Sequence, residues 1–164
     1  MTLDRLRPVA MRVLDPAVAV ATRVGLTPDA VSVIAFLLAV GAALTFWRGE
    51  SWYLLGALLV FLNGWLDLLD GALARAQGIE SASGDLLDHV LDRYADIALI
   101  AGLAAGVGAY GVGLLAVTGV LMTSYLGTQA QAVGLERVYG GIMGRADRLA
   151  LIGAVAVLAP FVPP

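Results

Sequence analysis

Long apolar runs alternate with short polar segments along this 164-residue chain, and this pattern predicts membrane-spanning helices. A helix needs about 20 apolar residues to cross a hydrocarbon core of about 30 Å. Five segments approach this length, although the last is short and ends at a proline pair. They cover residues 28–47, 52–75, 84–107, 111–130 and 149–162. The sequence therefore predicts an all-α fold, a polytopic transmembrane helix bundle with five spans.

The first residues follow a different pattern. Over residues 2–23, four arginines interrupt the apolar positions too often for a membrane span. This pattern predicts an amphipathic helix lying in the membrane interface, with a loosely attached tail as the alternative. Thr27-Pro28-Asp29 then provides a capping hydroxyl, a first-turn proline and an acid at the positive end of a helix. We expect a single domain over residues 1–164, divided into the interfacial helix (1–25) and the transmembrane bundle (26–164).

Composition and charge agree with a membrane protein. Hydrophobic residues make up 60% of the chain, charged residues only 14%, and the mean hydropathy is +0.87. With no cysteine, disulfides and thiol catalysis are excluded. The positive-inside rule favours a cytoplasmic N-terminus in a multi-pass protein of the cytoplasmic membrane, and no nucleic-acid partner is expected. In this orientation the inner side carries Arg5, Arg7, Arg12, Arg23, Arg75, Arg137, Arg145 and Arg148, and the outer side carries Arg48.

Four carboxylates interrupt the apolar sequence on either side of a short polar loop at residues 77–83. Each charge near a bilayer centre costs about 2.5–3.5 kcal/mol, so this cluster needs a compensating function. Asp67 and Asp70 are three residues apart, and Asp88 and Asp92 are four apart, so each pair shares a helix face. The short loop predicts antiparallel neighbouring helices, with all four carboxylates converging in a pocket that faces the cytosol.

Four converging carboxylates cannot all ionise without a cation. Oxygen ligands without cysteine favour a hard ion, Mg²⁺ or Mn²⁺, over zinc. Gly71 and Ala74 have little side-chain bulk, and the planar guanidinium of Arg75 suits a phosphate. Together these residues indicate a site that handles a diphosphate.

The motif Asp67-xx-Asp70-Gly71-xx-Ala74-Arg75-x8-Gly84-xxx-Asp88-xxx-Asp92 resembles, at all eight fixed positions, that of the CDP-alcohol phosphotransferases. These integral membrane enzymes displace CMP from a CDP-linked lipid with an alcohol. Ser124-Tyr125 and the segment 140–148 resemble the phosphatidylinositol-phosphate synthases and their archaeal counterparts within the family. The resemblance covers most of the chain and implies a homodimer of six-span subunits, one span more than this sequence contains.

The resemblance also implies roles for individual residues. The four motif acids Asp67, Asp70, Asp88 and Asp92 would bind two divalent ions, and Asp92 would also serve as the general base. Residues at the start of the first span and around the motif would bind the CDP-lipid: Asp29, Ser32, Gly71, Ala74, Arg75, Ser81 and Gly84.

The acceptor alcohol is less constrained by the sequence. Arg145 and Arg148 match an Arg-xx-Arg pattern of the inositol-phosphate enzymes and, with Arg137, are expected to bind an acceptor phosphate. Their alternative role is to anchor the topology. The basic residues typical of those enzymes after Ser124-Tyr125 are replaced here by Gly127 and Gln129. We favour inositol phosphate as the acceptor, with glycerol 3-phosphate or serine as alternatives.

Other interpretations remain open at this point. A divalent-cation transporter would also place acids within spans, but this chain has no second acidic helix pair. A silent scaffold would not need four acids. Asp85 and Asp96 fit pocket lining or helix capping as well as ligand contact, and His89 fits a hydrogen-bonding role better than metal ligation. Gly102 and Gly106 fit either a dimer face or close packing between helices.

Overall fold

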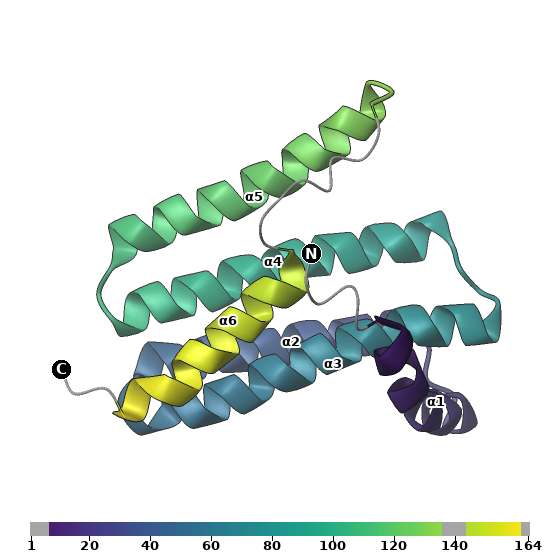
Figure 1. Ribbon diagram of the computed structural model, residues 1–164, viewed down its shortest axis with the longest axis horizontal. Helices are drawn as coiled ribbons and strands as arrows, with labels where there is room; N and C mark the ends of the chain where they lie inside the picture. The colour runs from purple at the N-terminus through teal and green to yellow at the C-terminus, as the bar shows by residue number, and fades with distance from the viewer. Residues whose placement is uncertain (1–6, 136–143, 162–164) are drawn as a thin grey trace.

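The computed structural model describes residues 7–135 and 144–161, and all regular structure within them is helical. Six α-helices occupy these residues (Figure 1): α1 (Arg7–Arg23), α2 (Pro28–Arg48), α3 (Tyr53–Gln77), α4 (Ala82–Gly106), α5 (Tyr110–Ala132) and α6 (Arg145–Leu158). Two short 3₁₀ turns, η2 (Glu50–Trp52) and η3 (Ala159–Phe161), lie at one end of the bundle. The predicted all-α fold is confirmed.

Helix α2 is the centre of the bundle and packs along both α3 and α4. Helices α1 and α6 lie against α3, and α5 lies against α4 on the outer side of the molecule (Figure 1). Small side chains allow this close packing. Ala39, Ala42 and Phe46 of α2 are fully buried together with Val60 of α3 and Leu99 of α4. This core cluster therefore lies in the half of the bundle away from the loop between α3 and α4.

The helix boundaries follow local capping signals. The Thr27 hydroxyl accepts a hydrogen bond from Ala30 N, and Pro28 opens α2 as the sequence predicts. The Ser81 hydroxyl accepts from Gly84 N and caps α4, which begins two residues before the expected start. Gly78 ends α3 at φ 64°, a left-handed conformation that glycine adopts without steric cost.

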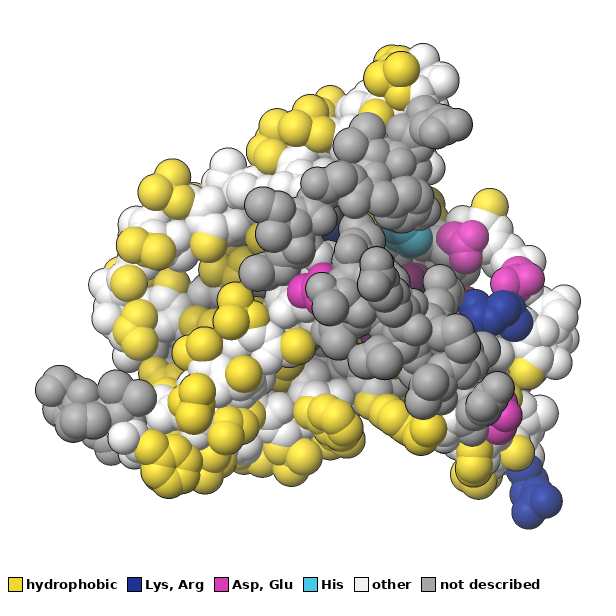
Figure 2. Space-filling view, viewed as in Figure 1, with side chains coloured by type: hydrophobic (Ala, Val, Ile, Leu, Met, Phe, Trp, Pro, Cys, Tyr) yellow, Lys and Arg dark blue, Asp and Glu magenta, His cyan; other side chains and the backbone are white. Residues whose placement is uncertain are grey.

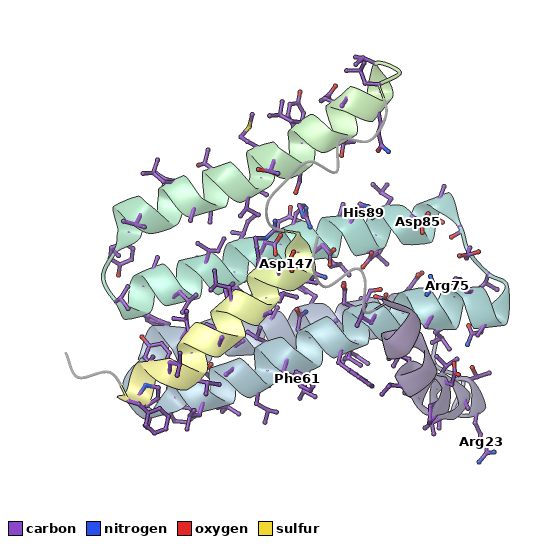
Figure 3. The ribbon with its side chains drawn as sticks, in the orientation of Figure 1. Arg23, Phe61, Arg75, Asp85, His89 and Asp147 are labelled. Atoms are coloured by element: carbon purple, nitrogen blue, oxygen red, sulfur yellow. The ribbon has the colours of Figure 1, made fainter. Side chains whose placement is uncertain are left out.

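The N-terminal helix α1 packs against the bundle. Leu14 and Ala21 are buried in a cluster with Val31 of α2 and with Leu69 and Leu73 of α3. Figure 3 shows Arg23 at the end of α1, pointing away from the other helices. This arrangement supports a packed amphipathic helix rather than the alternative of a loosely attached tail.

Three helices of the described chain, α2, α3 and α5, are long and apolar enough to cross a membrane. Helix α4 matches α3 in length, at 25 residues, but its first half carries several charges. Helix α6 has only 14 residues. Length and composition thus support three of the five predicted spans. On the face seen in Figure 2, charged side chains gather mainly toward α1 and the α3–α4 loop, and apolar ones cover the opposite end.

Two glycines bring α4 into backbone contact with α2. A Cβ atom on Gly102 would collide with the backbone of Ala43, and one on Gly106 with the carbonyl of Phe46. Of the two roles that the sequence leaves open for this glycine pair, the structure shows close packing between helices of one chain.

Candidate active site

Three of the predicted metal ligands form a cluster where α3 approaches the first half of α4. Asp67, Asp70 and Asp88 each offer a carboxylate oxygen, and these oxygens all lie within 4.8 Å of one another. Asp70 is buried and accepts a 2.7 Å hydrogen bond from the Ser32 hydroxyl of α2, which fixes its orientation. Three carboxylates at such distances repel one another unless a cation lies between them. This oxygen-only donor set fits a hard divalent ion.

The two acidic helices are not packed directly against each other. Close backbone contacts in the described chain join α2 to α3 and α2 to α4, whereas α3 and α4 do not form such an interface. Side chains of α2, α3, α4 and α6 instead line a small polar cavity between them, including Ser32, Asn63, Asp88 and Arg145. The expected antiparallel neighbours are therefore held apart by α2. This spacing leaves room for bound groups between the carboxylates.

The fourth motif acid, Asp92, lines the same cavity but belongs to an arginine-centred group. Arg145, at the start of α6, donates a hydrogen bond to Asp67 Oδ1 and forms a 2.8 Å ion pair with Asp92 Oδ1. The guanidinium thus joins a metal-cluster acid to the predicted general base. The structure brings all four motif acids together, although only three of them form the close carboxylate cluster that could hold a cation.

A second ionic group lies beside the first, around Asp96 of α4. Asp96 is buried, and its Oδ2 accepts a 2.9 Å hydrogen bond from Arg148. Arg93 lies 3.4 Å from the same oxygen and donates a hydrogen bond to the Ser124 hydroxyl of α5. Asp96 therefore lines the site as an arginine partner, one of the two roles that the sequence leaves open.

The residues predicted to bind the CDP-lipid lie at the loop end of the bundle. The Arg75 side chain folds over Gly71. A Cβ atom on that glycine would lie 3.4 Å from the Arg75 Nη1 atom. Likewise, a Cβ on Gly84 would lie 3.4 Å from Asp29 Oδ1, so the start of α2 approaches the start of α4. Ser81 is exposed and caps α4.

The remaining predicted residues occupy different positions. Ala74 is half-buried on α3 between Gly71 and Arg75. Arg137 lies outside the described residues. The exposed His89 uses its Nδ1 in a 2.7 Å hydrogen bond to the Asp85 carbonyl, which agrees with a hydrogen-bonding role. Figure 3 places Arg75 on α3, and Asp85 and His89 on α4, near the loop that joins these helices.

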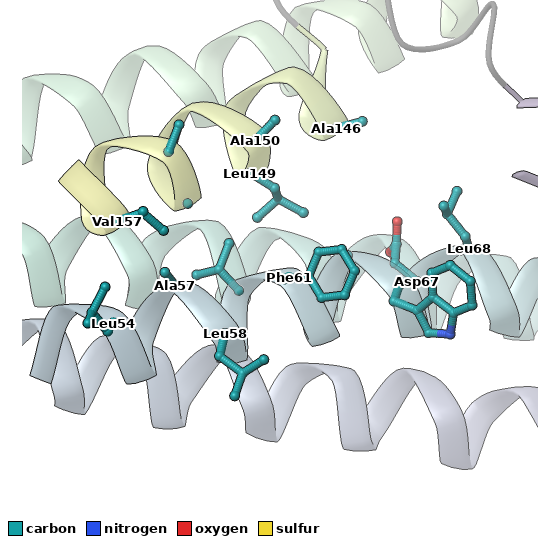
Figure 4. A pocket seen from close by; sticks show the side chains of 15 residues that line it. Leu54, Ala57, Leu58, Phe61, Asp67, Leu68, Ala146, Leu149, Ala150 and Val157 are labelled. Carbon is teal, nitrogen blue, oxygen red and sulfur yellow. The ribbon is translucent and has the colours of Figure 1, made fainter.

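An apolar groove of about 650 Å³ runs between α3 and α6 and reaches Asp67, one of the clustered acids (Figure 4). Leu54 and Val157 line one end, and Asp67 lies at the other. Gly64 and Gly153 add no side-chain bulk to its walls. The groove therefore connects a long hydrocarbon-like surface to the charged cluster.

Two residues of the site, Arg93 and Asp96, have contacts that the sequence does not predict. The sequence leaves two roles open for Asp96 and predicts none for Arg93. Their spacing of three residues, which places both on one helix face, was the available signal. Their partners on α5 and α6 depend on tertiary packing, which this spacing does not predict.

Comparisons with known proteins agree with this geometry. Residues 25–161 match the model of the CDP-alcohol phosphatidyltransferase family. The archaetidylinositol phosphate synthase of Methanothermobacter thermautotrophicus is 37% identical, over 99% of this chain and 80% of its own length. The phosphatidylinositol phosphate synthase of Mycobacterium tuberculosis with CDP-DAG bound superposes with a TM-score of 0.80 at 33% identity. The match covers 93% of this chain and 80% of that structure.

A second structure of the Mycobacterium tuberculosis synthase, in complex with manganese and citrate, superposes with a TM-score of 0.81 at 31% identity. That match covers 90% of this chain and 73% of the other. The chain belongs to the CDP-alcohol phosphatidyltransferase family. It is a membrane transferase, and the acid cluster marks it as a user of divalent metal. Membership in this family argues against the transporter alternative.

Proposed function

We propose that this enzyme transfers the phosphatidyl or archaetidyl group of a CDP-linked lipid to inositol phosphate and releases CMP, a step of phospholipid headgroup synthesis. One observation carries the proposal: the acid cluster lies between an apolar groove and a group of arginines paired with carboxylates. The apolar groove suits the hydrocarbon part of a CDP-linked lipid, and the arginine group suits the phosphate of a phosphorylated alcohol. The names of similar proteins, an archaetidylinositol phosphate synthase and a phosphatidylinositol phosphate synthase, support this choice of acceptor.

Two Mg²⁺ or Mn²⁺ ions would be held by the four motif acids Asp67, Asp70, Asp88 and Asp92. The shared cluster of three carboxylates and the position of Asp92 on the same cavity support this assignment. Such ions neutralise charge on a diphosphate and stabilise the charge that develops during phosphoryl transfer.

The protein's own groups perform the remaining work. Asp92 accepts the proton of the acceptor hydroxyl, whose oxygen attacks the β-phosphorus of the CDP-lipid. A new phosphorus–oxygen bond forms as the bond to the CMP phosphate breaks, and CMP leaves with the electron pair. Arg75 contacts the diphosphate, and the small residues Gly71 and Ala74 let the ligand approach α3. Asp29, Ser32, Ser81 and Gly84 complete the CDP-lipid site at the helix ends that surround it.

The groove between α3 and α6 would hold a hydrocarbon chain of the lipid. Residues 54 and 67 of α3 are 13 positions apart, and a rise of 1.5 Å per residue makes the groove about 20 Å long. Its apolar walls end beside Asp67, where the charged part of the substrate begins.

Arg145 and Arg148, with Arg137, would bind the acceptor phosphate. The pairing of Arg145 and Arg148 with buried or half-buried acids supports this role for those two over that of surface anchors of topology. We also propose that the enzyme is a homodimer in the cytoplasmic membrane, with the site facing the cytosol. The arginine distribution along the chain supports that orientation.

The proposal is tested by incubating purified protein with Mg²⁺ and either CDP-archaeol or CDP-diacylglycerol, and measuring CMP release. The acceptor panel contains inositol 1-phosphate, glycerol 3-phosphate, serine and free inositol. We expect release with inositol phosphate and little with the other acceptors. Equal or faster release with glycerol 3-phosphate or serine would replace the proposed acceptor. No release with any acceptor would reject the reaction.

A further inference from the structure

Three arginine side chains converge on one buried carboxylate at the edge of the site. Asp96 Oδ2 lies 2.9 Å from Arg148 Nη2 and 3.4 Å from Arg93 Nη2, and Asp96 Oδ1 lies 3.9 Å from Arg145 Nε. Asp96 is only 4% exposed. Burial of a carboxylate is costly unless it is paired, and three cations compensate that cost here.

The arginines are not fully satisfied by this pairing. The Nε atoms of Arg93, Arg145 and Arg148 are buried and have no hydrogen-bond partner within the described part of the chain. Buried donors without acceptors are rare in native proteins and call for an explanation. An anion with several oxygens, placed among three guanidinium groups, would supply the missing acceptors.

The balance of charge also favours an anion at this position once the acid cluster holds cations. Arg145 now contacts Asp67 and Asp92, and cations bound to those acids would compete for the same oxygens. Three guanidinium groups would then share Asp96 as their common carboxylate. This leaves an excess of positive charge next to the metal cluster, which favours a dianionic phosphate over a neutral alcohol.

Arg93 of α4 places a positively charged side chain against α5, which has no basic residue of its own. Helix α5 contains no lysine or arginine, and the positions one turn after Ser124 include Gly127 and Thr128. Arg93 donates a hydrogen bond to the Ser124 hydroxyl, so its guanidinium lies between α4 and this face of α5. The cation on the α5 side of the site therefore comes from α4.

We propose that Asp96 is a positioning residue that holds Arg93, Arg145 and Arg148 as one phosphate-binding group, in which Arg93 serves the α5 side. This inference rests on the proposed function, since the phosphate belongs to the acceptor alcohol. It adds Arg93 and Asp96 to the determinants of acceptor choice.

Kinetics of Asp96→Asn test the proposal, because this variant keeps the side-chain size and removes the charge. The KM for the alcohol phosphate should rise about tenfold or more, whereas the KM for the CDP-lipid should stay within about twofold. Asp96→Glu should recover part of the loss. Asp85→Asn, an exposed acid on the same helix, is the matched control and should behave like the wild type. Unchanged acceptor KM in Asp96→Asn would overturn the proposal.

Arg93→Gln provides a second variant in case Asp96→Asn folds poorly, because the Arg93 side chain is 30% exposed. It should show the same rise in acceptor KM alone. Equal effects on both substrates would indicate general damage and count against the proposal.

A binding measurement separates this inference from the proposed reaction. Protein loaded with Mn²⁺ should broaden the ³¹P resonance of inorganic phosphate, and Asp96→Asn should broaden it much less than Asp85→Asn. Phosphate binding by a wild type that releases no CMP would support the anion site and reject the proposed function. Turnover by the wild type with equal broadening in both variants would reject the inference and leave the function standing.

Discussion

The two halves of α4 differ in their packing: one is closely packed on α2, and the other borders a polar cavity. In the second half, Gly102 and Gly106 lie against the backbone of α2, and Leu99 is completely buried. In the first half, the helix is separated from α3 by a polar cavity, and its acids face carboxylates and arginines instead of apolar side chains. One end contributes to the core, and the other contributes to the chemistry.

This difference explains how a membrane protein can tolerate a dense group of charges. In the second half of α4, two glycines allow its backbone to pack directly on α2, which fixes the position of the helix. The first half can therefore remain separated from α3. The charges in the open half are then partly compensated by ion pairs, such as those of Arg145 with Asp67 and Asp92. Changes in the open half should therefore affect turnover, and changes in the packed half should affect stability.

The largest expected effect comes from removing a proposed cation ligand in the open half. Asp88→Asn should lower CMP release roughly 10²–10⁴-fold, because metal ions supply several kcal/mol of transition-state stabilisation. Mn²⁺ binding, followed by electron paramagnetic resonance, should weaken as well. Asp85→Asn, one turn earlier on α4, should retain both properties. Chelation by EDTA should abolish activity, with recovery on adding Mg²⁺; full activity in EDTA would contradict the metal site.

The next effect concerns Asp92, the proposed general base. Asp92→Asn should lower kcat about 10²-fold or more, the usual scale for the loss of a positioned base. CDP-lipid binding, measured by direct titration, should change little, since Arg75 and metal ions held by the remaining acids would still bind that substrate. A variant with near-normal kcat would show that another group accepts the proton.

Much of the fold was predictable because its signals are local. The first-turn proline and Thr27 set the start of α2, and the apolar lengths set the helices. The motif spacing placed Asp67, Asp70 and Asp88 in one cluster. The relation of α3 to α4 was not predictable from their short loop, because α2 packs between them through contacts distant in sequence.

The contacts of the arginine group were harder to predict from the sequence. Arg145 and Arg148 are predicted by a pattern, but their pairing with Asp67, Asp92 and Asp96 joins residues more than 50 positions apart. Arg93 looks like an ordinary charge until α5 supplies Ser124 as its partner. Such contacts follow from tertiary packing rather than from periodicity.

A smaller effect is expected at the acceptor side of the open half. Arg148→Gln should raise the KM for the alcohol phosphate roughly tenfold to a hundredfold, because charge-assisted bonds of about 1.5–3 kcal/mol are lost. The KM for the CDP-lipid should barely move. Free inositol should not replace its phosphate in the wild type. Wild-type kinetics in this variant, together with efficient use of unphosphorylated alcohols, would make Arg148 an anchor of topology.

The smallest effect on turnover is expected in the packed half of α4. Gly102→Ala places a methyl group against the backbone of Ala43, which cannot rotate away as a side chain could. Overpacking of this kind costs about 1–3 kcal/mol, so the melting temperature in detergent should fall. Well below that temperature, the kinetic constants should match the wild type, because the acids and arginines lie in the other half. Gly119→Ala on α5 is the matched control: a Cβ there has no neighbour within 4 Å, and its melting temperature should stay or rise. If Gly102→Ala melted normally but lost activity, the division of α4 into a structural and a chemical half would be wrong.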